Sequence, residues 1–262
     1  MEKLSRERLL ALTGLDPARL TLLEETGSTN DVAKTLARAG AAHGTAVLAE
    51  RQSAGRGRIG RSFLSPEGGL YLSVILRPDA GPEELMPLTV LLAAAALGPV
   101  EQAGVRVGVK WTNDLVVGGR KLAGILAEPA FTPKGRVDYV VCGIGVNCCA
   151  DAESFPPEIR QMATSLLAET GKEPDRTALA GGLIRAFTEA CLPERREALL
   201  GSYRKACVTL GRKVRVVRGE ESFLARAETV DDDGALWVLD ETGIRQKIFS
   251  GEVSVRGMYG YV

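Results

Sequence analysis

The fold of this chain is decided by residues 105–146, which read VRVGVKWTNDLVVGGRKLAGILAEPAFTPKGRVDYVVCGIGV. Apolar and β-branched runs at residues 105–111, 115–117, 121–128 and 137–146 indicate strands in quick succession. Gly118-Gly119, between two of these runs, is a hairpin-turn signature. Because the connections are too short to hold crossover helices, the stretch predicts a mixed, mainly antiparallel sheet rather than a doubly wound parallel one.

Helical patterns surround this stretch, so the fold class is α+β. We expect helices at residues 3–12, after Ser28 (which has capping-box spacing to Asp31), from Pro82 to about Gln102, and at residues 177–192. Earlier strands are expected at residues 20–23, 45–50 and 69–76. Residues 148–163 are rich in proline and polar residues and predict a loop.

The pattern changes after Leu210, where short β-type runs follow one another to the end of the chain. They lie at residues 214–217, 223–230, 236–239, 244–248 and 253–255, separated by turns such as RGEE, DDDG and DETG. About fifty residues of this kind indicate a small β-barrel. We therefore expect a large domain, big enough to hold a catalytic site, at residues 1–208, and a β-barrel domain at residues 209–262.

Composition limits the function classes. The chain has 262 residues with 33 Lys+Arg and 33 Asp+Glu, so it lacks the excess positive charge typical of a nucleic-acid binder. Five cysteines without a CxxC pair favour reduced thiols in the cytoplasm over a disulfide framework or a zinc site. The N-terminus does not resemble a signal peptide, and the apolar run at residues 88–100 is too short to span a bilayer. These features predict a soluble cytoplasmic protein with no membrane contact.

Residues 50–61, ERQSAGRGRIGR, carry four arginines and three glycines. We call residues 51–68 the arginine loop. Glycine keeps a loop mobile, and arginine suits phosphate or carboxylate, so RNA binding, a nucleotide-binding lid and a solvated loop all remain open. The GxGxxG spacing from Gly55 to Gly60 is not followed by a helix signal, and the loop lacks the Gly-Lys-Ser/Thr of a P-loop.

Other motifs are GSTN at residues 27–30, KWTND at 110–114, RKLAGIL at 120–126 and GIGVN at 143–147. Each is also typical of an ordinary structural feature: an Asn-Asp turn, an exposed lysine on an edge strand, or glycines where two backbones approach closely. No single motif identifies a function.

Together and in this order, these motifs and the β-rich tail resemble the biotin protein ligase family from about residue 20 to the end. The resemblance implies a fold related to class II aminoacyl-tRNA synthetases, followed by an SH3-like barrel. It implies ATP-dependent formation of biotinyl-adenylate, with Mg²⁺ accompanying ATP, and transfer of biotin to a lysine of a biotin carboxyl carrier protein.

The resemblance also implies site residues. Lys121, Arg58 and Asp114 match catalytic positions. The matches to biotin-binding positions are Ser28, Thr29, Asn30, Gln52, Gly55, Arg56, Arg58, Lys121, Gly124, Gly143 and Gly145. The matches to nucleotide-binding positions are Arg56, Arg58, Arg61, Phe63, Trp111, Asn113, Lys121 and Asn147. No ligands for Mg²⁺ are assigned.

Two residues depart from many relatives: Thr112 replaces a proline and Phe63 replaces a tryptophan. Bifunctional relatives carry a helix-turn-helix domain before the GSTN motif, whereas 27 residues precede Ser28 here. We therefore expect a monofunctional ligase that does not bind DNA. The alternatives are a lipoate or octanoate ligase and a non-enzymatic, biotin-sensing regulator. Homodimerisation, the identity of the acceptor carboxylase and the ligand affinities stay open.

Overall fold

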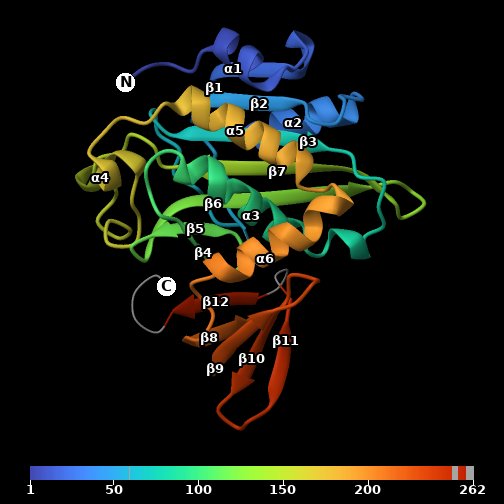
Figure 1. Cartoon of the computed structure of the whole chain (residues 1–262), viewed down its shortest axis with the longest axis vertical. Coiled ribbons are helices and arrows are strands. Elements are labelled where there is room, and N and C mark those ends of the chain that lie inside the picture. Colours follow the sequence, from blue (N-terminus) through green and yellow to red (C-terminus); the bar gives the residue numbers. More distant parts are fainter. Residues whose placement is uncertain (59, 250–252, 258–262) are drawn as a thin grey trace.

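The computed structural model describes residues 1–58, 60–249 and 253–257, and confirms an α+β chain with two separate sheets (Figure 1). The larger sheet has seven strands in the order β1-β2-β3-β7-β6-β5-β4. Its strands are β1 (Leu20–Thr26), β2 (Ala46–Gln52), β3 (Leu70–Leu76), β4 (Gly108–Lys110), β5 (Asp114–Val117), β6 (Arg120–Phe131) and β7 (Val137–Val146).

Only β1 and β2 are parallel in this sheet, and the five other neighbouring pairs are antiparallel. Helix α2 (Thr29–Arg38) connects the parallel pair, as a parallel connection requires. Gly118 and Gly119 have φ angles of 56° and 78°, which explains why two glycines form the β5–β6 hairpin. The predicted mixed, mainly antiparallel sheet is confirmed, but the strand expected at residues 105–111 shortens to Gly108–Lys110.

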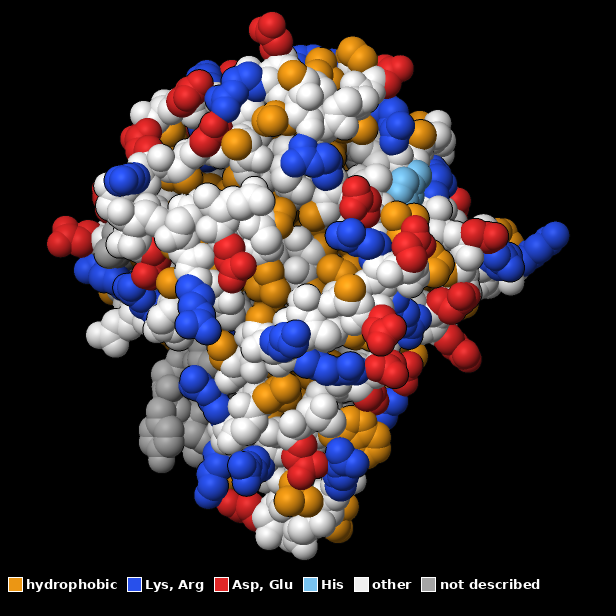
Figure 2. Space-filling view, in the orientation of Figure 1, with side chains coloured by type: hydrophobic (Ala, Val, Ile, Leu, Met, Phe, Trp, Pro, Cys, Tyr) orange, Lys and Arg blue, Asp and Glu red, His pale blue; other side chains and the backbone are white. Residues whose placement is uncertain are grey.

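One face of the large sheet is covered by α3 (Leu88–Glu101), α5 (Arg176–Glu189) and α6 (Arg196–Ala206), which cross in front of it in Figure 1. These helices enclose the main apolar core, including the fully buried Phe187 and Leu92. Within the described residues, Glu83–Glu101 is the one helical stretch long and apolar enough to cross a membrane, and 56% of that window is buried in the fold. Figure 2 shows charges of both signs interspersed over this side of the molecule.

The opposite face carries α2 and a smaller apolar cluster, in which Ala33 and Ala37 pack on Val47, Ile75 and Val141. The remaining short elements are α1 (Arg6–Thr13), which packs on α5, α4 (Leu166–Thr170), and the 3₁₀ turns Pro17–Arg19, Glu83–Leu85, Ala152–Ser154 and Pro193–Arg195. Residues 148–163 are irregular apart from one of these turns, as expected.

The second sheet has the order β11-β10-β9-β8-β12 and is antiparallel throughout. Its strands are β8 (Lys213–Arg218), β9 (Glu221–Val230), β10 (Leu236–Asp240), β11 (Arg245–Ile248) and β12 (Val253–Gly257). This small β domain contacts the large domain through the buried Trp111, whose indole N–H donates to the Gly234 carbonyl at 3.0 Å.

Candidate functional site

A small polar cavity lies beside the N-terminal end of α2 on the face of the large sheet opposite α3. Ser28, Thr29 and Asn30 line it from α2, together with Gln52 from the end of β2 and Gly143 and Gly145 from β7. A Cβ on Gly143 would lie 2.2 Å from Asn30 Oδ1, and a Cβ on Gly145 would lie 2.5 Å from the Phe63 ring. Glycine is therefore required at both positions for side chains to approach the strand this closely.

The polar groups of this cavity form a chain of hydrogen bonds. Ser73 Oγ lies 2.6 Å from Asn30 Oδ1 and 2.8 Å from Thr29 Oγ1. Because an amide oxygen only accepts, the Ser73 hydroxyl donates to Asn30. Gln52 Oε1 accepts from the Thr29 backbone N–H at 2.8 Å. The amide orientations of Asn30 and Gln52 are thus set by their neighbours.

Two further residues fix Asn30 from behind the cavity. Asn30 Nδ2 donates to Glu128 Oε2 at 2.7 Å, and the Lys34 ammonium donates to the other carboxylate oxygen. Asn30 is 4% exposed. Its Oδ1 therefore stays on the Ser73 and Gly143 side, and its NH₂ stays on the Glu128 side.

The arginine loop crosses the sheet near this cavity. Arg58 Nη1 donates to Asn113 Oδ1 at 2.9 Å and to Thr112 Oγ1 at 3.3 Å, in the turn that follows β4. Burial lowers the pKa of the Arg58 guanidinium, and the charge of Asp114 opposes that shift. Arg56 forms an ion pair with Asp31 of α2 at 2.8 Å. The loop is thus held at two points by its own arginines.

Lys121 and Asp114 form the charged centre of the site, with the ammonium 2.7 Å from the carboxylate. Asp114 pairs with Gly124 across the β5–β6 hairpin, and a Cβ on Gly124 would lie 3.0 Å from Lys121 Nζ. The ammonium also lies 5.6 Å from the centre of the Phe63 ring. Its side chain is 26% exposed, so a ligand can reach it.

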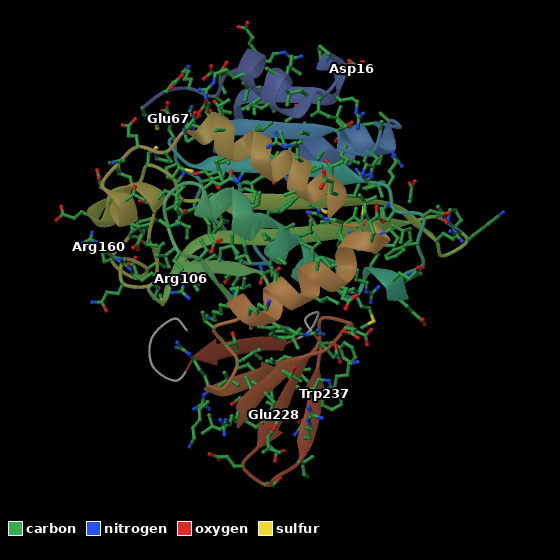
Figure 3. All side chains as sticks on the ribbon, viewed as in Figure 1. Asp16, Glu67, Arg106, Arg160, Glu228 and Trp237 are labelled. Carbon is green, nitrogen blue, oxygen red and sulfur yellow. The ribbon has the colours of Figure 1, made fainter. Side chains whose placement is uncertain are left out.

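A second, larger cavity of about 240 Å³ lies on the other side of Phe63. Phe63 and Lys121 line it together with apolar residues of the irregular segment, among them Phe155, Ile159 and Met162. Glu67, which also lines it, is labelled in Figure 3. Burial raises the pKa of Tyr71 and of the Cys148 thiol at this cavity, so both stay protonated at neutral pH. Since Phe63 lines both cavities, its ring is the partition between them.

The structure brings most of the expected site residues together. The small cavity gathers Ser28, Thr29, Asn30, Gln52, Arg56, Phe63, Gly124, Gly143 and Gly145, and the larger one gathers Arg61, Phe63, Lys121 and Asn147. Gly55 adjoins Gln52, since a Cβ there would lie 3.2 Å from Gln52 Nε2. Asn113 and Asp114 lie at the β4–β5 turn, where Arg58 binds Asn113 and Asp114 pairs with Lys121.

Two residues differ from the rest of this set. Trp111 is 4% exposed, belongs to the main apolar core and lines neither cavity, so its assignment to the nucleotide site stays a prediction. Ser28 occupies the N-cap position of α2, yet its side chain makes no capping hydrogen bond and lines the small cavity instead.

Sequence reasoning missed the residues that support the site. Ser73 and Glu128 are polar residues that follow apolar runs within their strands, and Phe155, Ile159 and Met162 are apolar residues in an irregular segment. A polar residue in a mainly apolar strand and apolar residues in a loop are both unusual, and both could have marked these positions as candidate site residues.

Comparison with known proteins agrees with this geometry. Residues 22–147 match the Biotin/lipoate A/B protein ligase family, and residues 209–256 match the Biotin protein ligase C terminal domain. The chain is 35% identical to a biotin--[acetyl-CoA-carboxylase] ligase of Mycobacterium tuberculosis, covering 96% of this chain and 94% of that one. It is 34% identical to the bifunctional ligase/repressor BirA of Bacillus subtilis, covering 87% of this chain and 71% of that protein.

Solved structures agree as well. A biotin protein ligase from Aquifex aeolicus in complex with biotin and ATP matches with a TM-score of 0.76 and 30% identity, covering 91% of this chain and 98% of that one. A biotin protein ligase from Leishmania major in complex with biotinyl-5-AMP matches with a TM-score of 0.60 and 28% identity, over 88% and 98% of the two chains. The resemblance drawn from the motifs is confirmed, and the chain belongs to the biotin protein ligase family.

Proposed function

We propose that the chain activates biotin with ATP and transfers it to a lysine of a biotin carboxyl carrier protein, hereafter the carrier protein. The observation that carries this proposal is the position of Lys121, which lines the larger cavity, pairs with Asp114 and lies beside Gly124 of the polar cavity. Family membership and the names of the relatives support the same activity.

The polar cavity suits the ureido ring of biotin. A urea offers one carbonyl and two N–H groups, and the cavity offers the Asn30 and Gln52 amides with the Ser28 and Thr29 hydroxyls. A site built from such groups rejects a ligand that lacks matching polar atoms, because the groups would be left unpaired. This argues against lipoate and octanoate, whose rings or tails have no urea.

The cavity must open to admit biotin. Its volume of about 30 Å³ is close to the space of one water molecule. Phe63 and Arg56 line it, so both must shift for a bicyclic ring to enter. We propose that the arginine loop is a lid whose Arg56–Asp31 ion pair is exchanged for a contact with the anionic ligand.

In the first step a carboxylate oxygen of biotin bonds to the α-phosphorus of ATP, and the bond from that phosphorus to pyrophosphate breaks. Lys121, Arg58 and Arg56 carry the positive charge needed to bring two anions together. Lys121 is placed for this role because its ammonium lies between Asp114 and the Phe63 ring.

The larger cavity suits the adenine and ribose of ATP, with Phe63, Arg61 and Asn147 as the proposed contacts. An aromatic ring there can stack on the base. Asn113 is a further proposed contact, reached through its hydrogen bond with Arg58. Mg²⁺ would accompany the ATP phosphates and stabilise their negative charge. Asp114 is a candidate carboxylate for it.

In the second step the amine of the carrier lysine attacks the carbonyl carbon of biotinyl-adenylate, AMP leaves, and the amine loses a proton. A free lysine has a pKa near ~10.4, so the amine arrives mostly protonated. We assign Asp114 to orienting this amine, because its carboxylate is held by Lys121 at the edge of the site.

We further propose that the acceptor is a carboxylase carrier protein, as the names of relatives indicate. The division at residues 208 and 209, the cytoplasmic location and the lack of operator binding stay predictions, and homodimerisation stays open.

The deciding experiment measures pyrophosphate release from Mg-ATP with biotin, lipoate and octanoate in turn. We expect release with biotin only. Equal rates with lipoate would overturn the assignment of the polar cavity to the ureido ring. Binding of biotin without any pyrophosphate release would favour the non-enzymatic sensor.

A further inference from the structure

A cationic groove lies along the β4 edge of the large sheet, beside the small β domain. Three exposed cations, Arg106, Lys205 and Arg212, line a cavity of about 440 Å³ above a floor of small residues that includes Gly108 and Val116. None of the described residues that line it is acidic. Figure 3 labels Arg106 at the edge of the sheet, above the small β domain.

The positive charge continues onto the small β domain. Lys213 of β8 lies directly opposite Arg226 of β9, and both side chains are exposed. Like charges at directly opposite positions destabilise an antiparallel pair. The nearby Glu228 does not neutralise them, because it pairs with Arg245 at 2.8 Å. Basic side chains are visible on this domain in Figure 2.

We call Arg106, Lys205, Lys213 and Arg226 the cationic strip. No carboxylate among the described residues forms an ion pair with Arg106, Lys205, Lys213 or Arg226. Because the chain as a whole is neutral, the strip is a local excess of charge. Such an excess, kept at a cost to the sheet, is typical of a surface that meets an anionic partner.

The strip adjoins the reacting groups. Asp114 and Val116 are two residues apart on β5, so their side chains leave the same face of the sheet about 7 Å apart. Val116 lines the groove and also pairs with Lys121 across the hairpin. The groove therefore begins next to the Lys121–Asp114 pair, where the acceptor amine arrives in the proposed second step.

We propose that the cationic strip docks an acidic face of the carrier protein during the second step. The proposal rests on the proposed function, because only that reaction requires a protein partner beside Asp114. A nucleic acid would need no such proximity to the reacting pair. Docking here would not involve the polar cavity or the ATP cavity. Adenylate formation and transfer to the carrier protein can therefore be measured separately.

The test compares two double variants. Arg106→Glu with Lys205→Glu reverses the strip, and Arg38→Glu with Lys134→Glu reverses two exposed cations on α2 and on the β6–β7 hairpin as a matched control. Each is assayed for biotin-dependent pyrophosphate release and for transfer to a purified biotin carboxyl carrier domain. Thermal melting checks that both remain folded.

In the strip variant we expect the KM for the carrier domain to rise at least ~10-fold, with pyrophosphate release unchanged. Its carrier KM should also depend less on salt than that of the wild type, since fewer charges are screened. An equal carrier KM in the two variants would overturn the proposal. So would salt-sensitive binding of duplex DNA that the strip variant loses while its carrier KM stays normal. If the wild-type chain releases no pyrophosphate with biotin, the proposed function itself fails instead.

Discussion

The two faces of the large sheet are built on opposite principles. On one face α3, α5 and α6 bury side chains such as Phe187 and Leu92 in a continuous apolar core. The other face carries α2 and two cavities. Polar groups surround these cavities: the hydrogen-bonded Ser73, Asn30 and Glu128, and the Lys121–Asp114 ion pair. Packing on the first face tolerates apolar side chains of similar size, whereas the polar groups on the second face need specific hydrogen-bond partners.

This difference between the two faces indicates that one face mainly determines stability and the other mainly determines activity. Loss of an apolar side chain leaves a void and lowers the free energy of unfolding. Loss of a charge or a hydrogen-bond partner in an open site changes ligand binding more than folding, since the site is already partly exposed to water. Variants on the two faces should therefore separate the two properties.

The largest effect is expected on the apolar face. Phe187→Ala removes a ring that is 0% exposed and should lower the free energy of unfolding by about 3–5 kcal/mol. Chemical denaturation measures this change. Below the lowered melting temperature, the KM values for biotin and ATP should stay within about twofold of the wild type. A large change in either KM at low temperature would mean that the two faces are coupled.

On the polar face, Lys121→Gln roughly keeps the side-chain length but removes the cation at the carboxylate–phosphate encounter. We expect biotin-dependent pyrophosphate release to fall by at least ~10², with little loss of stability. Arg120→Gln is the matched control, because Arg120 pairs with Glu169 instead, at 2.8 Å. A near-normal rate of pyrophosphate release in Lys121→Gln would mean that Lys121 has no role in the reaction and is an ordinary strand lysine.

Glu128→Gln tests whether the polar face depends on hydrogen-bond direction. The new amide oxygen should turn to Lys34, so that its NH₂ meets the NH₂ of Asn30 and forces the Asn30 amide to rotate. We expect the KM for biotin to rise about 10-fold, with the KM for ATP unchanged. Adding Lys34→Met should let the amide oxygen face Asn30 and restore the biotin KM. A double variant no better than the single one would contradict the directional argument.

The smallest expected effect concerns the arginine loop. Trypsin should cleave after Arg51, Arg56, Arg58 or Arg61 in the free protein, and biotin with ATP should slow this cleavage several-fold by ordering the lid. Mass spectrometry of the fragments identifies the bonds. Cleavage within the small β domain serves as an internal control, because ligand should leave its rate unchanged. Protection by RNA, without protection by biotin and ATP, would mean that the loop binds a polyanion.

The sequence predicted the sheets better than the helices around them. Strand β7 was predicted at its observed bounds, Val137–Val146, because an apolar run rich in valine and isoleucine is typical of a buried strand. Helix α6 was missed, since Gly201 interrupts its pattern and its stability comes from packing on α3. Helix α4 has five residues and depends on capping by Ser165 and Gly171, which a periodicity argument does not detect.

The site residues also fall into a group that could be predicted from the sequence and a group that could not. Spacing and family resemblance predicted the residues that line the cavities, because these lie in short motifs. They did not predict Ser73 or Glu128, whose partner Asn30 is 43 and 98 residues away along the chain. Only the folded sheet brings such residues together.

The indole of Trp111 also gives the molecule an optical reporter. The chain has two tryptophans, and Trp111 is buried where the small β domain meets the large one, hydrogen-bonded to Gly234. Trp237 instead lies in β10, stacked on the Arg245 guanidinium at 4.6 Å. With Trp237 replaced by phenylalanine, a red shift in emission would therefore report that water has entered the junction. Stopped-flow fluorescence could then follow whether the two domains separate during turnover, without any added dye.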